Sequence, residues 1–583
     1  MGSMLVAIDQ LEVTFRAEHE TIKAVNGVSL DIKKGEILGV VGESGSGKSV
    51  TALALMQLIQ SPGTISGGKI LYTSGQDAVN LLALSPGDMR AYRGNDIAMI
   101  FQEPMTSLNP LHTCGSQVME AIRLHKRVSS AEARQQTIAL FQKVKLPDPE
   151  QLLQRYPHEL SGGQKQRVMI AMAISCNPRL LIADEPTTAL DVTVQQAILQ
   201  LLRELQQQMD MSVIFITHDL GVVAEIADRV IVMYKGNIVE QGPVKEVLLA
   251  PQHPYTKGLL ACRPPLDKRL YRLPVTRDFM EVDEQGRIQE KPAAVKALVD
   301  SLVVTAAAQA AREQVLAANP PLLEVHNLCT WFPAKRSFLG KVQSWVKAVN
   351  NVSFNVITGE TLGLVGESGC GKSTLGRTLL RLIPPTSGTV LYKGQDLADL
   401  SPTAMRHIRK ELQLIFQDPY SSLNPRLTIG SAIAEPMQVH GLNGNERQRR
   451  EKVLELLEKV NLRPEHYHRY PHEFSGGQRQ RIVIARALAV APSFIICDES
   501  VAALDVSIQA QVLNLLMQLR EEMGFTCIFI SHDLSVVRFM SDRMMVMSKG
   551  EIVEMGPADQ VYNHPQSAYT QKLIAAIPKG MYV

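Results

Sequence analysis

Two glycine-rich segments of this chain have the residue types and spacing of a phosphate-binding loop: GESGSGKS at residues 42–49 and GESGCGKS at residues 366–373. Glycines let the backbone N–H groups of such a loop wrap phosphate oxygens at the start of a helix. The lysine then reaches the β- and γ-phosphates, and the serine hydroxyl binds Mg²⁺. The sequence therefore predicts two ATP sites. Their phosphate contacts are expected from Gly42, Ser44, Gly45, Gly47, Lys48, Ser49 and Val50, and from Gly366, Ser368, Gly369, Gly371, Lys372, Ser373 and Thr374.

An acidic pair follows a short apolar run downstream of each loop: Asp184 and Glu185 after LLIA, and Asp498 and Glu499 after FIIC. Taken alone, such a pair is usually a solvated turn. Downstream of a phosphate-binding loop, the aspartate suits Mg²⁺ coordination and the glutamate suits orienting a water for attack on the γ-phosphate. The two glutamates are therefore predicted to be catalytic. The predicted metal ligands are Ser49, Gln102 and Asp184 in the first copy, and Ser373, Gln417 and Asp498 in the second.

A histidine and a glutamine complete each copy. His218 and His532 follow the last apolar run, and Gln102 and Gln417 each follow Ile-Phe. A single histidine is more often structural, and a single glutamine is more often a surface residue. Their recurrence at the same place in both copies favours contacts with the γ-phosphate and, for the glutamines, with Mg²⁺. We therefore predict that both histidines are catalytic and that both glutamines bind the nucleotide.

The motifs recur in one order, at an offset of 324 residues between Lys48 and Lys372 and of 314 between His218 and His532. A near-constant offset indicates two homologous lobes, which we place at residues 4–263 and 322–583. Short apolar runs in each lobe are typical of buried parallel strands, so the predicted fold class is α/β.

Residues 264–321 depart from this repeat and form the predicted linker. Apolar residues recur at helical spacing between Val295 and Ala306. This periodicity predicts an amphipathic helix within residues 292–318 that is docked on a lobe.

The composition is that of an ordinary globular protein, with 45% hydrophobic and 20% charged residues among 583. Sixty basic and 58 acidic residues give a net charge of +2, which offers no electrostatic case for nucleic acid binding. The seven cysteines are scattered, without a CxxC pair or a Cys/His cluster, as expected of reduced thiols. No apolar run reaches the ~20 residues of a spanning helix, so we expect that the chain does not cross a membrane.

The SGGQ segments at residues 161–164 and 475–478, each followed by KQR or RQR, complete a recognisable set of motifs. Together with both loops and the DEP/DES and THD/SHD segments, they resemble the ABC-type ATPases over nearly the whole chain. The resemblance implies two P-loop ATPase domains, each a RecA-like core with an antiparallel β subdomain and a helical subdomain. It also implies that the lobes pair head to tail around ATP and Mg²⁺. The first site would be closed by Ser475, Gly477 and Gln478, and the second by Ser161, Gly163 and Gln164.

The same resemblance marks three further features. The ALD segments at residues 189–191 and 503–505 resemble the D-loops of the family, which communicate across the lobe interface. Phe15 and Phe332 align with the aromatic residue that stacks on adenine, with packing in the core as the alternative. Cys370 replaces the serine of the first loop. Its place beside a lysine and a helix N-terminus favours a thiolate, and a small filler side chain is the alternative.

The FQEPMTSLNP and FQDPYSSLNP segments and the HPYT segment at residues 253–256 resemble the oligopeptide/dipeptide importer ATPases. This implies uptake of peptides or a related small solute, two transmembrane permease subunits and, indirectly, an extracytoplasmic substrate-binding protein. The chain would lie on the cytoplasmic face of the inner membrane, and no nucleic acid partner is expected. Only Cys262 lies near HPYT, so no iron–sulfur cluster is expected. A soluble tandem ABC ATPase acting on ribosomes or DNA is the alternative, but SGGQ and the absence of zinc-type cysteine pairs argue against it.

Overall fold

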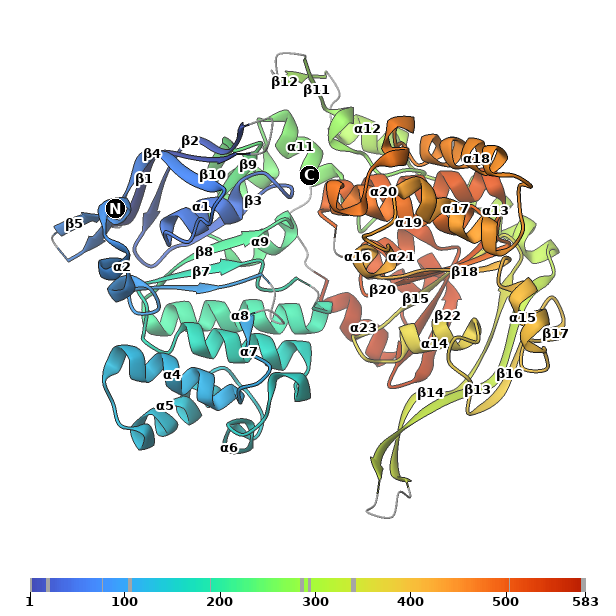
Figure 1. The fold of residues 1–583 in the computed structure, drawn as a ribbon, viewed down its shortest axis with the longest axis horizontal. Coiled ribbons are helices and arrows are strands. Elements are labelled where there is room, and N and C mark those ends of the chain that lie inside the picture. The colour runs from blue at the N-terminus through green and yellow to red at the C-terminus, as the bar shows by residue number, and fades with distance from the viewer. Residues whose placement is uncertain are drawn as a thin grey trace.

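The computed structural model describes residues 3–16, 21–75, 77–102, 107–188, 190–283, 288–291, 295–336, 342–502 and 504–577. The chain forms two lobes that lie side by side, the first blue to green and the second yellow to red (Figure 1). Each lobe contains a six-stranded sheet and a separate four-stranded antiparallel sheet. The repeat in the sequence is thus a repeat of the fold, and the predicted α/β class is confirmed.

The six-stranded sheet of the first lobe has the strand order β10-β9-β3-β8-β7-β6, in which only β10 is antiparallel to its neighbour. Every residue of β3, β7 and β8 is buried, because helices cover both faces of a parallel sheet. Parallel strands place their carboxyl ends at one edge, so this edge collects the predicted site. The strands are β3 (Ile37–Val41), β6 (Ile97–Ile100), β7 (Leu180–Asp184), β8 (Ser212–Thr217), β9 (Arg229–Tyr234) and β10 (Asn237–Pro243).

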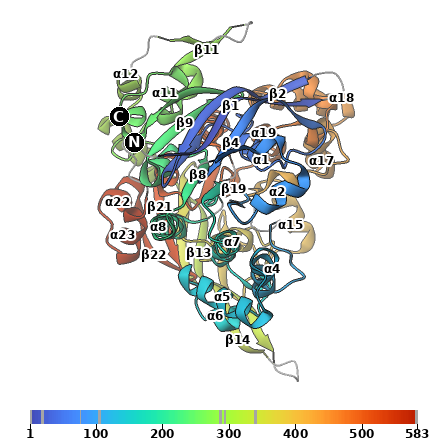
Figure 2. The same cartoon turned by 90° about the vertical axis from the view of Figure 1, so that its left-hand side faces the viewer.

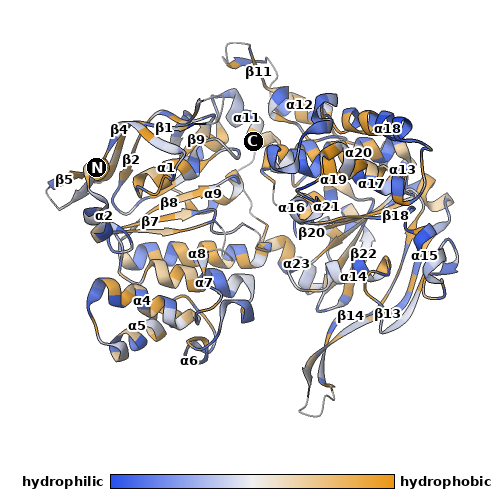
Figure 3. Ribbon diagram, in the orientation of Figure 1, coloured by the Kyte–Doolittle hydropathy of each residue, from blue (hydrophilic) through white to orange (hydrophobic). Residues whose placement is uncertain are grey.

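The second lobe repeats this sheet in the order β18-β19-β20-β15-β21-β22. Its central strands are again fully buried, and the same strands lead into the phosphate-binding loop and the acidic pair. In Figure 3 the central strands of both lobes are coloured as hydrophobic, whereas the charged helix α18 is mostly hydrophilic. The strands are β15 (Thr361–Val365), β18 (Leu412–Ile415), β19 (Phe494–Asp498), β20 (Thr526–Ser531), β21 (Arg543–Ser548) and β22 (Glu551–Pro557).

The antiparallel sheets form the outer layer of each lobe, in the orders β2-β1-β4-β5 and β14-β13-β16-β17. The β13–β14 pair is longer than β1–β2 and projects from the second lobe (Figure 1). The strands are β1 (Met4–Arg16), β2 (Thr21–Lys33), β4 (Gly63–Ser74), β5 (Asp77–Asn80), β13 (Pro321–Arg336), β14 (Val342–Ile357), β16 (Ser387–Tyr392) and β17 (Gln395–Asp396).

Helices pack on the sheets, and part of them form a helical subdomain in each lobe. Figure 2 shows α4, α5 and α6 of the first lobe at the end away from β1, β2 and β4. The first lobe contains α1 (Lys48–Leu55), α2 (Pro86–Tyr92), α4 (Cys114–Lys126), α5 (Ser130–Lys143), α6 (Pro149–Leu152), α7 (Gly162–Ala173), α8 (Val192–Met209), α9 (Leu220–Ile226), α10 (Val244–Leu249) and α11 (Pro254–Ala261). No helix in the described part of the chain is long and apolar enough to span a membrane.

The second lobe repeats these helices. They are α14 (Lys372–Leu379), α15 (Pro402–Ile408), α16 (Pro419–Ser422), α17 (Ile429–Val439), α18 (Glu446–Lys459), α19 (Gly476–Leu488), α20 (Val506–Met523), α21 (Leu534–Met540), α22 (Ala558–Asn563) and α23 (Ala568–Ala575).

The linker contains a short strand pair, β11 (Met280–Val282) and β12 (Ile288–Glu290), and two helices, α12 (Val295–Ser301) and α13 (Ala306–Ala318). We expected one helix within residues 292–318, of which 292–294 lie outside the described residues. The helix is interrupted because Val303 pairs with Leu270 and Thr305 caps a new helix. The linker packs on both lobes: Met280 lies in the hydrophobic core of the first lobe, and Leu270 and Leu273 lie in that of the second. The Arg312 guanidinium bonds both carboxylate oxygens of Asp542, at 3.0 and 3.1 Å.

Candidate functional site

The first phosphate-binding loop joins β3 to α1. Gly47 caps α1 with φ of 101°, and a Cβ atom on Gly42 would lie 2.2 Å from the Met233 carbonyl oxygen, so both positions require glycine. The buried Lys48 ammonium folds back over the loop and donates to the carbonyl oxygens of Gly42 at 2.6 Å and Glu43 at 2.9 Å. The loop therefore has the curved backbone and the inward lysine that phosphate binding needs.

The second loop, between β15 and α14, has the same construction. Gly371 caps α14 with φ of 111°, and the Lys372 ammonium donates to the carbonyl oxygens of Gly366 at 2.8 Å and Glu367 at 3.1 Å. Cys370 is buried here, and burial raises the pKa of its thiol despite the charge of Lys372. Of the two alternatives, this burial favours the small side chain that fills space over the thiolate.

Each predicted metal site brings two oxygen donors together. The Ser49 hydroxyl donates to Asp184 Oδ1 at 2.9 Å, and the Ser373 hydroxyl donates to Asp498 Oδ1 at 2.7 Å. Burial raises the pKa of Asp184 to about 6, although the bond from Ser49 opposes the rise. A buried carboxylate beside a hydroxyl suits a small hard cation such as Mg²⁺. The donor chemistry of these residues therefore fits the metal that the sequence predicts.

The predicted catalytic glutamate of the first lobe is held by several donors. Gln102 Nε2 donates to Glu185 Oε2 at 3.0 Å, and His218 Nδ1 lies 3.4 Å from the same oxygen. Burial alone would raise the pKa of Glu185, but the hydrogen bonds and charges of His218, Thr188 and Lys48 together outweigh it and lower the pKa to about 2. The carboxylate is thus ionised and fixed. The Thr188 hydroxyl also donates to Oε2, at 2.9 Å, a contact that the sequence analysis missed.

The second lobe holds Glu499 in a related way. Gln417 Nε2 donates to Glu499 Oε2 at 2.9 Å, and His532 Nδ1 lies 3.6 Å from it. Here Ala502 stands at the position of Thr188, and Lys372 Nζ lies 3.6 Å from Glu499 Oε1. Both predicted catalytic glutamates have φ of 47°, a left-handed conformation that is costly for this residue type and is found at functional sites.

Residues of each predicted D-loop contact the phosphate-binding loop of the other lobe. Asp505 Oδ2 accepts the backbone N–H of Ser44 at 2.8 Å, and Asp191 Oδ2 accepts that of Ser368 at 3.3 Å. The Thr193 hydroxyl adds a 2.8 Å bond to Glu367 Oε1. The first residues of these segments, 189 and 503, lie outside the described part of the chain. The contacts are reciprocal: the aspartate of each lobe accepts a backbone N–H from the phosphate-binding loop of the other.

The SGGQ segments begin helices α7 and α19. Ser161 caps α7 by accepting from Gln164 N at 3.3 Å, while Gln164 Oε1 accepts from Ser161 N at 3.1 Å. Ser475 and Gln478 repeat this capping box at α19. A groove of about 590 Å³ lies between the first segment, including Gly163, and α23 of the second lobe.

The two predicted adenine-stacking aromatics lie in different surroundings. Phe15, on β1, is half-buried against the core of the first lobe, and its ring lies 2.6 Å from where a Cβ on Gly63 would be. Phe332, on β13, pairs with Val346 across the hairpin and is 40% exposed. Stacking on adenine remains a prediction for both residues.

Two sites, each with a phosphate-binding loop, an oxygen-rich metal position and a fixed carboxylate, define a tandem P-loop nucleotide hydrolase. The ABC transporter family matches residues 25–188 and 349–502. The oligopeptide/dipeptide transporter C-terminal region matches residues 239–285 and 553–580.

Two relatives match almost the whole of this chain. The glutathione import ATP-binding protein GsiA of Salmonella choleraesuis (strain SC-B67) is 50% identical over 577 residues, or 98% of this chain and 89% of the relative. The protein of the same name from Escherichia coli O6:H1 is 51% identical over 578 residues, with the same coverage. A solved ATP-binding cassette bound to ADP and Pi is 30% identical, with a TM-score of 0.37, and the match covers 40% of this chain and 98% of that one.

The chain belongs to the ABC transporter family of ATP-binding proteins. It is an ATPase subunit of an ABC importer, and such a subunit works with membrane permeases.

Proposed function

We propose that this ATPase drives uptake of small peptides, with glutathione as the first candidate. The observation that carries the proposal is the oligopeptide/dipeptide transporter C-terminal region, which matches once from the end of the first lobe into the linker and once at the end of the second lobe. The relatives that match 98% of the chain are named glutathione import proteins, and glutathione is itself a small peptide. Selection of the solute would reside mainly in the substrate-binding protein and the permeases.

Hydrolysis would use the same groups at both sites. In the first, the loop amides and Lys48 bind phosphate oxygens, and Ser49 and Asp184 would hold Mg²⁺. The bound metal supplies positive charge beside the phosphoryl oxygens. Glu185, fixed by Gln102 and His218, orients the attacking water. Lys372, Ser373, Asp498, Glu499, Gln417 and His532 would do the same at the second site.

ATP would bind at the contact between the lobes and favour their closure. Support comes from the reciprocal bonds of Asp505 and Asp191 to the opposite loops. The SGGQ helices would complete each site by directing N–H groups at the γ-phosphate, Ser475, Gly477 and Gln478 at the first and Ser161, Gly163 and Gln164 at the second. Closure driven by ATP and reopening after hydrolysis would then be transmitted to two permease subunits.

In this role the chain would be a peripheral subunit on the cytoplasmic face of the inner membrane. A substrate-binding protein would deliver the solute to the permeases. The test is uptake of labelled glutathione and of a dipeptide by cells that lack the chain and are complemented with wild type or Glu185→Gln. Accumulation that requires the wild-type chain supports the proposal. Normal uptake of both solutes without the chain refutes it.

A pull-down of the tagged chain from detergent-solubilised membranes tests the partners. Recovery of two permeases in equal amounts supports the assembly. Recovery of ribosomes or DNA without permeases would instead favour the alternative of a soluble tandem ATPase.

A further inference from the structure

The aspartate that follows each predicted catalytic histidine is anchored differently in the two lobes. Asp219 Oδ1 accepts from the Gly221 N–H at 2.8 Å and from Arg263 Nη1 at 3.0 Å. Asp533 Oδ1 accepts from the N–H of Ser535 at 2.8 Å and from its hydroxyl at 2.5 Å. The same carboxylate is thus satisfied by a distant guanidinium in the first lobe and by a local hydroxyl in the second.

The two arrangements compete for the same space. At the offset of 314 residues, Gly221 corresponds to Ser535 and Arg263 corresponds to Ile577. A Cβ atom on Gly221 would lie only 2.1 Å from Arg263 Nη1, so the arginine reaches the carboxylate because the serine is missing. The Arg263–Asp219 pair is also well shielded, with side-chain exposures of 11% and 22%.

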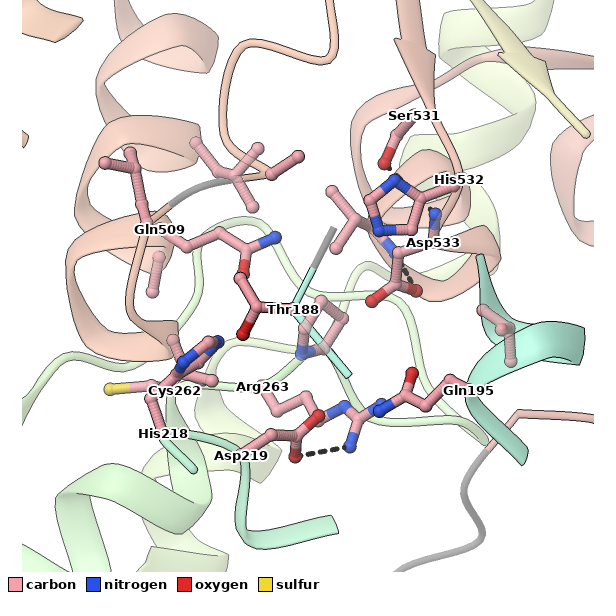
Figure 4. A pocket seen from close by; sticks show the side chains of 18 of the residues that line it. Thr188, Gln195, His218, Asp219, Cys262, Arg263, Gln509, Ser531, His532 and Asp533 are labelled. Carbon is pink, nitrogen blue, oxygen red and sulfur yellow. Dashed lines mark hydrogen bonds and ion pairs between the residues drawn. The ribbon is translucent and has the colours of Figure 1, made fainter. Parts of the chain in front are cut away.

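Asp219 holds the backbone that carries His218. The Asp219 N–H donates to the hydroxyl of Thr217, which precedes the histidine, at 3.1 Å, and the Asp219 carboxylate caps α9, which follows it. The backbone is therefore fixed both before and after His218. His218 in turn contacts Glu185. Figure 4 shows the Arg263–Asp219 pair beside a cavity of about 110 Å³ that is lined by both His218 and His532.

Arg263 directly precedes the linker, and the linker is bonded to the second lobe within a few residues. The Leu266 carbonyl accepts from Arg538 at 2.6 Å, and the Arg269 guanidinium donates to the Ser541 carbonyl at 2.7 Å. Arg263 therefore lies between the backbone that carries His218 and the first residues of the linker, which are bonded to the second lobe.

We propose that Arg263 is a positioning residue of the first ATP site, which holds His218 through Asp219 and couples it to the linker. At the second site, Ser535 anchors Asp533 locally instead. Both sites have the same set of predicted catalytic groups, but the aspartate beside the histidine is anchored differently in each. The proposal rests on ATP hydrolysis at the first site.

The test measures ATPase kcat and KM of the full-length chain with Arg263→Ile, alone and combined with His218→Ala or His532→Ala. With His532→Ala, where the first site carries turnover, the substitution should lower kcat about five- to tenfold and leave the KM for ATP unchanged. With His218→Ala it should have no further effect, because Arg263 acts through that histidine. An equal loss in both combinations, or no loss with His532→Ala, would overturn the proposal.

A double variant that copies the second lobe's arrangement into the first, here called the transplant, distinguishes an effect on the position of His218 from an effect on the stability of the fold. Gly221→Ser with Arg263→Ile should restore kcat to within about twofold of wild type, since the serine hydroxyl replaces the guanidinium. Lys268→Ala, which removes an exposed linker pair with Asp300, is the matched control. If Arg263→Ile alone does not fold, the transplant still decides: a folded transplant with low kcat and an unchanged melting temperature refutes the proposal.

Discussion

Substitution of Asp505 by alanine tests whether the observed contact between the lobes is the one used in hydrolysis. Asp505 accepts the N–H of Ser44 at 2.8 Å and is only 9% exposed. It makes no side-chain cap for α20, so the substitution removes an interlobe bond without weakening a helix. Asp191 is a poorer probe, because its carboxylate also caps α8 through Val194 N at 2.9 Å.

The magnitude follows from the type of bond. A hydrogen bond to a charged acceptor contributes about 1.5–3 kcal/mol when it is shielded from water. Loss of the Asp505–Ser44 bond from the closed state would lower the ratio of closed to open lobes by about 10- to 150-fold. We therefore expect Asp505→Ala to lower ATPase kcat at least tenfold, with a melting temperature close to that of the wild type.

Asp505→Asn is the matched control for this experiment, since an amide oxygen can still accept the Ser44 N–H without the charge. It should retain more turnover than Asp505→Ala. If Asp505→Ala keeps more than half of the wild-type turnover, the contact is not part of the hydrolytic state and the reasoning is wrong.

Three other outcomes are expected. Glu185→Gln and Glu499→Gln should each lower turnover at least tenfold while ATP binding, measured with a fluorescent analogue, is kept; near-normal turnover in either would show that its site is dispensable. Cys370 should react with a thiol reagent slowly in the native chain and quickly in urea, because burial raises its pKa; fast native labelling would contradict this. Arg312→Ala should lower the free energy of unfolding by about 1.5–3 kcal/mol. Burial would raise the pKa of Asp542, but the bond from Arg312 lowers it below 3.8. The stabilisation by this pair should therefore be present above pH 3.8 and be lost as the pH falls through the folded-state pKa of Asp542. Urea titrations at several pH values can check this dependence.

Most of the candidate site could be predicted from the sequence because it lies at the ends of short, fully buried strands. Such strands are visible as apolar runs, and parallel strands must bring their carboxyl ends to one edge. The pairing of Ser49 with Asp184 and the approach of Gln102 and His218 to Glu185 follow from that geometry.

What the sequence analysis missed depends on details of turns and packing that local patterns do not encode. Thr188 reaches Glu185 only because the glutamate adopts a left-handed conformation and the turn curls back. The pKa of Cys370 follows from burial against its surroundings, which outweighs the nearby lysine that was visible in the sequence. The interruption of the linker helix follows from a bridge between Val303 and Leu270, residues 33 positions apart.

The linker determines how the two lobes can separate. Leu270 and Leu273 are buried in the hydrophobic core of the second lobe, and the Asn514 side chain bonds both the N–H and the carbonyl of Leu273 at 2.8 Å. This part of the linker therefore belongs to the second lobe. Only Pro264 and Pro265 lie between Arg263, at the end of the first lobe, and Leu266. The three backbone steps from Arg263 to Leu266 can span about 10 Å when extended. A tether this short keeps the lobes of one chain at high effective concentration and favours pairing within the chain over pairing between two copies.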